Sequence, residues 1–177
     1  MMAEVMRKVL DILLYTVIVA LLCCCTKQDR ENTIIGQEAA IDNYLSTLQG
    51  VELVRAGGSN RAVVTMGIDG TEAAKGDSLY IRYAGYIFSN GKGQLFTTND
   101  QDVAQKFSFP MQEAPMKIKL GKTELVKGLE LGLEGVKEGE YCYIVFSAKY
   151  GFNNTSVGNI PRLSPLFYEI WVDKVIK

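Results

Sequence analysis

Residues 120–140 have the sequence LGKTELVKGLELGLEGVKEGE, and this glycine-rich stretch constrains the fold more than any other. Its leucines and charged residues favour a short helix, yet Gly128 and Gly132 lie inside it. Each such glycine costs a helix about 0.5–1 kcal/mol relative to alanine. Because Gly128 and Gly132 are four residues apart, they share one side of the helix, where we expect close packing against another part of the backbone. Gly135 and Gly139 are expected in turns that lead into the next strand.

Composition limits the chemistry that this chain can perform. The 177 residues are 47% hydrophobic and 22% charged, as in a globular domain with extra segments. The sequence contains no histidine, which excludes Ser-His-Asp and Cys-His catalysis and every metal site that uses histidine. The net charge of −1 and the lack of a basic stripe argue against a nucleic-acid partner. We therefore expect no cofactor, no metal and no nucleic acid.

The first 25 residues have the layout of a secretory signal. Arg7 and Lys8 form a basic start, and residues 12–22 form an apolar run that is too short to span a membrane comfortably. Three adjacent cysteines, residues 23–25, follow this run. The only other cysteine, Cys142, is expected to be a small buried residue in a strand, so no intrachain disulfide is predicted within the folded body.

The stretch LLCCCTKQ resembles the lipoprotein box of bacteria, in which a signal peptidase cuts before a cysteine that carries lipid. The order of residues favours Cys25 as the lipidated residue, with Cys24 as the alternative. This interpretation predicts a signal peptide over 1–24 and a lipidated tether over 25–35, which would hold the protein on a membrane of the bacterial cell envelope, facing the periplasm or the surface. The other interpretation is an uncleaved anchor with incidental cysteines.

Residues 36–74 are predicted to form an extension with a helix and two strands. The helix covers 36–49 and ends at Gly50, and its apolar face consists of Ala40, Ile41, Tyr44, Leu45 and Leu48. This face suggests that the helix could pair with a second copy of the chain. The two strands, at 51–55 and 61–66, flank the turn AGGSN.

The remaining residues, 75–177, alternate as strands around one short helix, which predicts an α+β fold. Strands are predicted at 79–88, 94–98, 116–120, 136–148 and 165–176, with the helix at 125–133. Residues 98–114 show no strong period and are expected to leave the sheet. In the last strand, one face carries Leu166, Tyr168, Ile170 and Val172, and the other carries Phe167, Glu169, Trp171 and Asp173.

Four blocks in this region occur in the order of one family: KGDSLYIRYAGYIFSNGKGQLFTT, PMKIKLGKTELVKGLELGLEGVKEGE, YIVFSAKYG and NIPRLSPLFYEIWVDKV. They resemble the FKBP-type peptidyl-prolyl cis-trans isomerases, and with the N-terminal signal the chain is similar to FKBP-like lipoproteins of Bacteroides-type bacteria. The resemblance implies a twisted antiparallel β-sheet wrapped around one short α-helix, here with an N-terminal helical extension. It also implies an apolar proline site between helix and sheet, and proline-containing polypeptides as clients.

The resemblance assigns site residues position by position. The residues implied to be catalytic are Tyr83, Phe96, Val126, Leu129, Tyr150 and Tyr168, and those implied to bind substrate are Thr97, Met116, Leu125 and Ile160. In this scheme the Tyr150 hydroxyl bonds a substrate carbonyl, Leu129 forms the floor, Ile160 lies at the rim and Tyr168 closes the back.

Several positions depart from the family pattern. Leu129 replaces a tryptophan of the best-studied members, Thr97 replaces an aspartate, and Met116 and Ile118 replace aromatic residues. The turn before Tyr150 is two residues shorter than is usual in the family. We therefore expect a wider, less aromatic and less polar pocket. The alternative to an active isomerase is a catalytically weak or inactive proline-binding lipoprotein with the same fold.

Overall fold

A computed structural model describes Met6 and residues 27–177 of the chain. The predicted signal peptide, apart from Met6, and the predicted lipid site at Cys25 lie outside these residues. In the described part no helix has the length and apolar character needed to cross a membrane. The chain divides into two compact units, one that ends at Gly36 and one that comprises Gln37–Lys177, and the second holds the sheet.

Residues 27–47 are helical. Residues 27–35 therefore belong to a helix, although they were expected to form part of a polar tether. The helix ends two residues before the predicted end. Its predicted apolar face is confirmed, because Ile41 and Leu45 are buried and Tyr44 packs against the same cluster. That face is covered by the chain's own sheet, so it gives no argument for pairing with a second copy.

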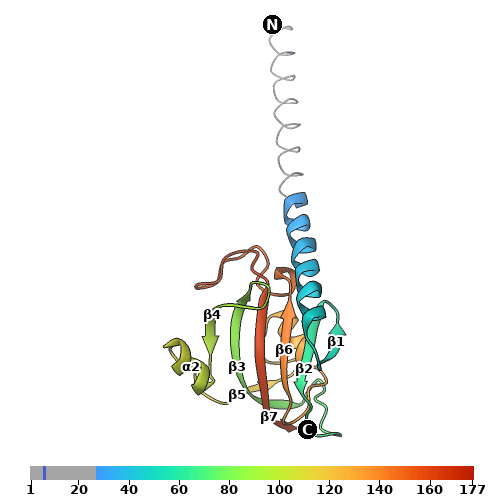
Figure 1. Ribbon diagram of the computed structural model, residues 1–177, viewed down its shortest axis with the longest axis vertical. Coiled ribbons are helices and arrows are strands. Elements are labelled where there is room, and N and C mark those ends of the chain that lie inside the picture. Colours follow the sequence, from blue (N-terminus) through green and yellow to red (C-terminus); the bar gives the residue numbers. More distant parts are fainter. Residues whose placement is uncertain (1–5, 7–26) are drawn as a thin grey trace. The chain divides into compact units, whose positions relative to one another are not determined.

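Seven antiparallel strands form one sheet in the described part of the chain (Figure 1). Their bounds are β1 Glu52–Ala56, β2 Ser59–Thr65, β3 Ser78–Phe88, β4 Lys92–Thr98, β5 Met116–Lys119, β6 Tyr141–Phe146 and β7 Leu166–Ile176. The order across the sheet is β1-β2-β6-β7-β3-β4, with β5 also paired to β3. The strands predicted for the N-terminal extension are thus part of the main sheet, since β2 pairs with β6 along its length.

β3 is the strand that organises the pocket side of the sheet. One edge of β3 pairs with β7. Its other edge is shared, because β5 pairs with residues 78–81 and β4 with residues 84–88. The two partners leave a break at Arg82 and Tyr83, which a later segment of the chain fills.

Side chains alternate between two hydrophobic cores, one on each face of the sheet. On β7, the predicted alternation is confirmed: Leu166, Tyr168, Ile170 and Val172 lie in the core beneath helix α3, Lys127–Leu133. Phe167 lies in the other core, with the helix residues Ile41 and Leu45. Cys142 is fully buried, as predicted, and burial raises the pKa of its thiol well above the usual value.

The chain leaves the sheet after Thr98, as expected, and then forms a helix that was not predicted, α2 Gln101–Phe107. Asp100 is its N-cap, and the Asp100 carboxylate accepts a hydrogen bond from the Val103 backbone N–H. An N-cap aspartate is a signal that could have predicted this helix. The strand predicted over 136–148 is shorter, because Gly135 and Gly139 both adopt positive φ in turns before β6. A 3₁₀ turn, Ala148–Tyr150, follows β6. The predicted α+β fold is otherwise confirmed.

Candidate active site

The glycines of α3 let this helix lie directly on the sheet. A Cβ atom added to Gly128 would stand 2.2 Å from Cγ of Phe146, and one added to Gly132 would stand 2.4 Å from Cγ2 of Ile144. Heavy atoms do not approach so closely, so any side chain at either position would push the helix off β6. The close packing expected at the two glycines is confirmed, although the atoms they meet belong to side chains and not to the backbone. This packing brings Leu129 of the same helix onto the core.

Arg61 of β2 holds the other end of α3. Its Nη1 donates hydrogen bonds to the carbonyl oxygens of Gly132 (3.0 Å) and Glu134 (2.9 Å), and its Nη2 donates to that of Gly135 (3.3 Å). These carbonyls have no partner within the helix, and a cation near a helix C-terminus is favourable. Nε of Arg61 lies 3.4 Å from a carboxylate oxygen of Glu140, and both side chains are buried. No pattern in the sequence predicts this contact, which links the N-terminal extension to the helix.

A pocket of about 440 Å³ lies between α3 and the concave side of the sheet. The site residues that the resemblance implied and that the structure brings together in its lining are Tyr83, Thr97, Met116, Leu125, Val126, Leu129 and Tyr168. They come from β3, β4, β5, β7 and the start of α3, so segments far apart in the sequence meet here. α3 begins at Lys127, two residues later than predicted, because Val126 has an extended backbone as the N-cap, so Leu125 and Val126 precede the helix. Leu129, 7% exposed, forms the floor.

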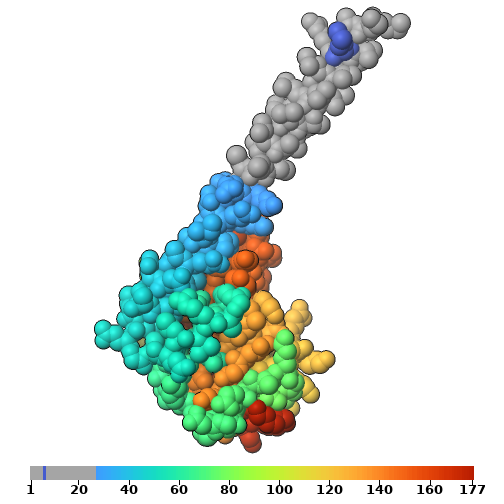
Figure 2. Space-filling model, turned by 90° about the vertical axis from the view of Figure 1, so that its right-hand side faces the viewer, coloured from blue at the N-terminus to red at the C-terminus, as the bar shows by residue number. Residues whose placement is uncertain are grey.

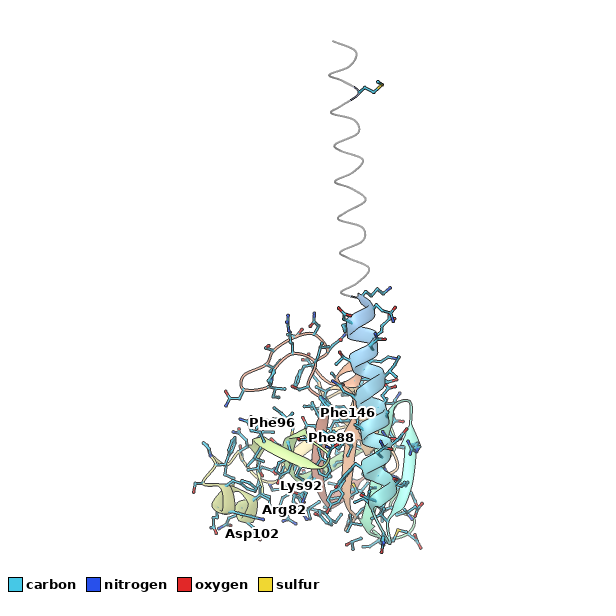
Figure 3. All side chains as sticks on the ribbon, turned by 45° about the horizontal axis from the view of Figure 1, so that its top comes forward. Arg82, Phe88, Lys92, Phe96, Asp102 and Phe146 are labelled. Atoms are coloured by element: carbon cyan, nitrogen blue, oxygen red, sulfur yellow. The ribbon has the colours of Figure 1, made fainter. Side chains whose placement is uncertain are left out.

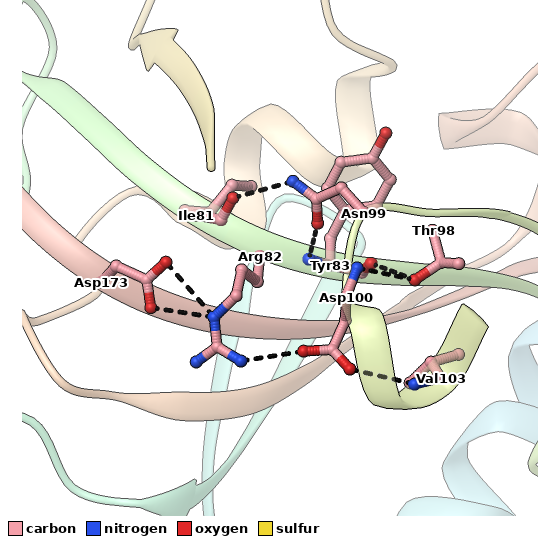
Figure 4. A network of polar contacts seen from close by, with 8 residues as sticks. All are labelled: Ile81, Arg82, Tyr83, Thr98, Asn99, Asp100, Val103 and Asp173. Atoms are coloured by element: carbon pink, nitrogen blue, oxygen red, sulfur yellow. Dashed lines mark hydrogen bonds and ion pairs between the residues drawn. The ribbon is translucent and has the colours of Figure 1, made fainter. Parts of the chain in front are cut away.

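The wall residue Tyr83 is positioned by a polar network at the break in β3 (Figure 4). The Asn99 side chain accepts a hydrogen bond from the Tyr83 backbone N–H (2.6 Å) and donates one to the Ile81 carbonyl (3.2 Å). Beside it, the guanidinium group of Arg82 forms ion pairs with the carboxylates of Asp100 (2.8 Å) and Asp173 (3.2 Å). The network therefore replaces the missing strand partner of β3.

Three residues implied by the resemblance do not line this pocket. Phe96 packs edge-on against Tyr168, with ring centroids 5.8 Å apart, and is itself absent from the lining. Ile160 is 5% exposed and lies in the core, where its backbone pairs with Val157. Tyr150 lies against Gly58, at a separate hollow of about 190 Å³, also lined by Glu38 and Ser147.

Three further residues line the pocket: Ile81, Glu124 and Phe152. Phe152 follows Tyr150 by two residues, so the short turn after β6 places a different aromatic residue at the pocket. Glu124 is exposed, and it is the single charged residue in the lining formed by the described residues. Ile81 was predictable from strand alternation, since it shares a face of β3 with Tyr83.

Hydroxyl groups are the other polar side-chain groups among the described residues that line the pocket. The Tyr83 hydroxyl lies 3.5 Å from Oγ1 of Thr97, a long contact in which either atom could donate. Tyr168 is 6% exposed, and burial, followed by the proximity of Tyr83, raises the pKa of its phenol. Tyr168 therefore stays neutral at physiological pH. Among the described residues, most of the lining is apolar, and its polar side chains are Tyr83, Thr97, Tyr168 and the exposed Glu124.

Comparison with known protein families supports the interpretation of this pocket as an active site. A family model described as FKBP-type peptidyl-prolyl cis-trans isomerase matches residues 70–173, which include every residue of the pocket lining.

This chain is a member of the FKBP-type peptidyl-prolyl cis-trans isomerase family. The enzyme class predicted from the sequence is therefore confirmed. FK506-binding protein 1 of Aspergillus oryzae is 25% identical over 118 residues, which cover 67% of this chain and 98% of that protein. FK506-binding protein 3 of Candida albicans is 33% identical over 101 residues, but the match covers only 20% of that longer protein.

Solved structures share the FKBP fold with this chain. A peptidyl-prolyl cis-trans isomerase from Pseudomonas syringae pv. tomato matches with a TM-score of 0.62 and 18% identity, covering 83% of this chain and 96% of that one. FkpA from Escherichia coli matches with a TM-score of 0.59 and 19% identity, covering 91% and 69%. At such identities the likeness concerns the fold, and the roles of individual residues rest on the geometry described above.

Proposed function

We propose that the pocket beneath α3 binds the proline ring of polypeptide clients and speeds cis–trans isomerisation of the preceding peptide bond there. The observation that supports this proposal is the apolar pocket itself, walled by Tyr83, Val126 and Tyr168 and floored by Leu129. Its volume of about 440 Å³ has room for a proline ring together with neighbouring main-chain atoms. Membership of the FKBP-type family supports the same activity, peptidyl-prolyl cis–trans isomerisation.

The chemistry requires neither a nucleophile nor a metal. An X-Pro bond prefers trans by only about 0.5–1 kcal/mol, yet resonance in the planar amide imposes a barrier near 18–20 kcal/mol. The planar amide is more dipolar than the twisted one, so water stabilises it relative to the transition state. An apolar pocket removes this hydration and can hold the ring while the preceding carbonyl turns. Catalysis then consists of tighter binding of the twisted form.

The proposal is tested by NMR exchange of an X-Pro peptide with the full-length chain. We expect cis–trans exchange above the buffer rate, and Val126→Asp should reduce the acceleration at least about tenfold because a carboxylate in the pocket restores polarity and hydration. Val64→Asp, the same change at an exposed position of β2, is the matched control and should keep the wild-type rate. Wild-type exchange at the buffer rate would refute catalysis.

The alternative is a proline-binding protein of the same fold with little activity. Tyr150, implied to bond a substrate carbonyl, lies outside the pocket lining, and Leu129 supplies the floor without an aromatic ring. These two observations favour the alternative. It would be indicated if X-Pro peptides shift the resonances of the pocket residues while their exchange rate stays at the buffer value.

We further propose that the mature protein is held on the bacterial cell envelope by lipid on Cys25. The support is the sequence LLCCCTKQ after a basic start and a short apolar run. Several acyl chains on one cysteine would give stable membrane attachment, which a single chain does not. Cys25→Ser should move the protein from the membrane fraction to the soluble fraction, whereas Cys24→Ser should leave it membrane-bound. If both variants stay with the membrane, the assignment of the lipid to Cys25 is wrong.

A further inference from the structure

Tyr168 is the most firmly held aromatic side chain of the pocket. Its ring meets that of Phe96 edge-on, with centroids 5.8 Å apart, and stacks on that of Phe146, with centroids 6.0 Å apart. Phe96 belongs to β4 and Phe146 to β6, and both are labelled in Figure 3. β6 pairs directly with β7, whereas β3 lies between β7 and β4. Because two rings fix its orientation, the position of the Tyr168 hydroxyl is set before any ligand arrives.

That hydroxyl has no hydrogen-bond partner among the described residues, although Tyr168 is only 6% exposed. Among the described residues, the fully enclosed side-chain atoms without a hydrogen bond are Oγ of Ser59, Nε of Arg61 and Oε1 of Glu140. The Tyr168 hydroxyl is not one of them. It is therefore in contact with open space, and the space that Tyr168 lines is the pocket. Because this hydroxyl faces the pocket and has no partner in the protein, a ligand that supplies an acceptor can form a hydrogen bond with it without breaking one inside the protein.

The other hydroxyls near the site are less suited to meet a ligand. Tyr83 and Thr97 face one another at 3.5 Å and can each satisfy the other in part. Tyr150 lies at a separate hollow with Gly58. Among the described residues that line the pocket, Tyr168 is therefore the hydroxyl donor that has no hydrogen-bond partner within the protein.

A proline segment offers the complementary chemistry. Proline has no backbone N–H, so the main chain beside its ring presents carbonyl acceptors and lacks the donor that another residue would bring. A neutral phenol can donate to such a carbonyl, whereas the carboxylate of Glu124 can only accept. The burial that raises the pKa of Tyr168 keeps the phenolic proton in place.

We propose that the Tyr168 hydroxyl donates a hydrogen bond to a main-chain carbonyl oxygen adjoining the proline ring of the client, which makes Tyr168 a specificity-determining residue. This inference rests on the proposed function, in which the pocket holds the proline ring. It assigns to Tyr168 a polar role in addition to its place in the apolar wall.

The test compares the affinity of the full-length chain for three X-Pro peptides, measured by NMR titration. The first peptide is unmodified, the second carries sulfur for oxygen in the carbonyl before proline, and the third carries sulfur in the carbonyl of proline itself. Tyr168→Phe should weaken binding of the unmodified peptide about three- to tenfold, the range for a single hydrogen bond. For one of the two sulfur peptides, wild type and Tyr168→Phe should bind equally, because sulfur is a weak acceptor.

Tyr80→Phe is the matched control. Tyr80 is half-buried on β3, lies beneath Lys117 and does not line the pocket, so the same loss of a hydroxyl there should change no affinity. Equal affinity of wild type and Tyr168→Phe for the unmodified peptide would overturn the inference. So would a weakening of the same size for all three peptides, since the effect would then act through packing. If the wild type binds none of the peptides, the proposed function itself fails.

Discussion

The side-chain oxygen of Asn99 accepts a hydrogen bond from the backbone N–H of Tyr83 at 2.6 Å, and this contact closes the break in the sheet between β5 and β4. Asn99 is 1% exposed, and its amide nitrogen also donates to the carbonyl of Ile81. One side chain thereby satisfies a backbone donor and a backbone acceptor that no strand reaches. The pocket wall at Tyr83 depends on it.

Asn99→Ala should lower the free energy of unfolding by about 2–4 kcal/mol, because it leaves two buried backbone groups without partners. Urea denaturation measures this loss. Asn154→Ala, the same change in an exposed loop, should cost less than about 0.5 kcal/mol. A loss no larger for Asn99→Ala than for Asn154→Ala would show that the network does not hold the wall.

Gly128→Ala should destabilise the protein by about 3 kcal/mol, the upper end of the usual cost of overpacking, because its Cβ would meet the Phe146 ring. Gly36 is also helical, but a Cβ there would meet nothing within 4 Å. Gly36→Ala should therefore leave the free energy of unfolding unchanged or raise it by up to about 1 kcal/mol. Both values come from urea denaturation, and a stable Gly128→Ala variant would contradict the close approach of α3 to β6.

Arg61→Met should cost about 3–5 kcal/mol, because it leaves the Glu140 carboxylate buried without its cation and the end of α3 without donors. In Figure 2 the teal surface, which includes the β1–β2 hairpin, lies beside orange surface from the second half of the chain, in agreement with the pairing of β2 with β6. The comparison is Arg55 of β1, whose exposed side chain forms an ion pair with Asp42 of the N-terminal helix. Arg55→Met should cost less than about 1 kcal/mol.

A second readout separates the role of Arg61 at the helix from a general loss of stability. Proline-peptide affinity at low temperature, where the variant remains folded, should fall for Arg61→Met because Leu129 moves with α3. Arg55→Met should bind peptide as the wild type does. Unchanged affinity of folded Arg61→Met would mean that the pocket floor does not depend on this contact.

Stability should decline at alkaline pH. Burial raises the pKa values of Tyr86, Tyr141 and Tyr168 above the ordinary value of 10.0. Above about pH 10 the unfolded chain releases these protons while the folded state keeps them, so stability is complete below that pH and is lost as pH rises.

The free energy of unfolding of Tyr168→Phe should fall less steeply with pH than that of the wild type. The two slopes should differ by up to about 1.4 kcal/mol per pH unit, which corresponds to the release of one proton. Urea denaturation at about pH 8 and about pH 11 measures the two slopes. Identical slopes for wild type and Tyr168→Phe would show that Tyr168 ionises as readily in the folded state as in the unfolded chain.

Much of the fold was predictable because its signals are local. The alternation along β7 fixed which of its residues face α3, and the spacing of Gly128 and Gly132 predicted a side of the helix in close contact. The ordered family blocks predicted the fold and most of the pocket lining. The helix α2 was missed although Asp100 carried its N-cap signal, because its seven residues lack a clear apolar period.

The sequence by itself therefore determined the strands, the pocket helix and the chemical character of the site, since these depend on periodicity and residue type over short stretches. Only the tertiary structure decided which side chains meet. Arg61 reaches the end of α3 across some seventy positions of sequence, Asn99 completes β3 at a break set by two other strands, and the short turn after β6 brings Phe152 into the pocket and Tyr150 to Gly58. Such contacts depend on the register and packing of distant strands, which no local pattern encodes.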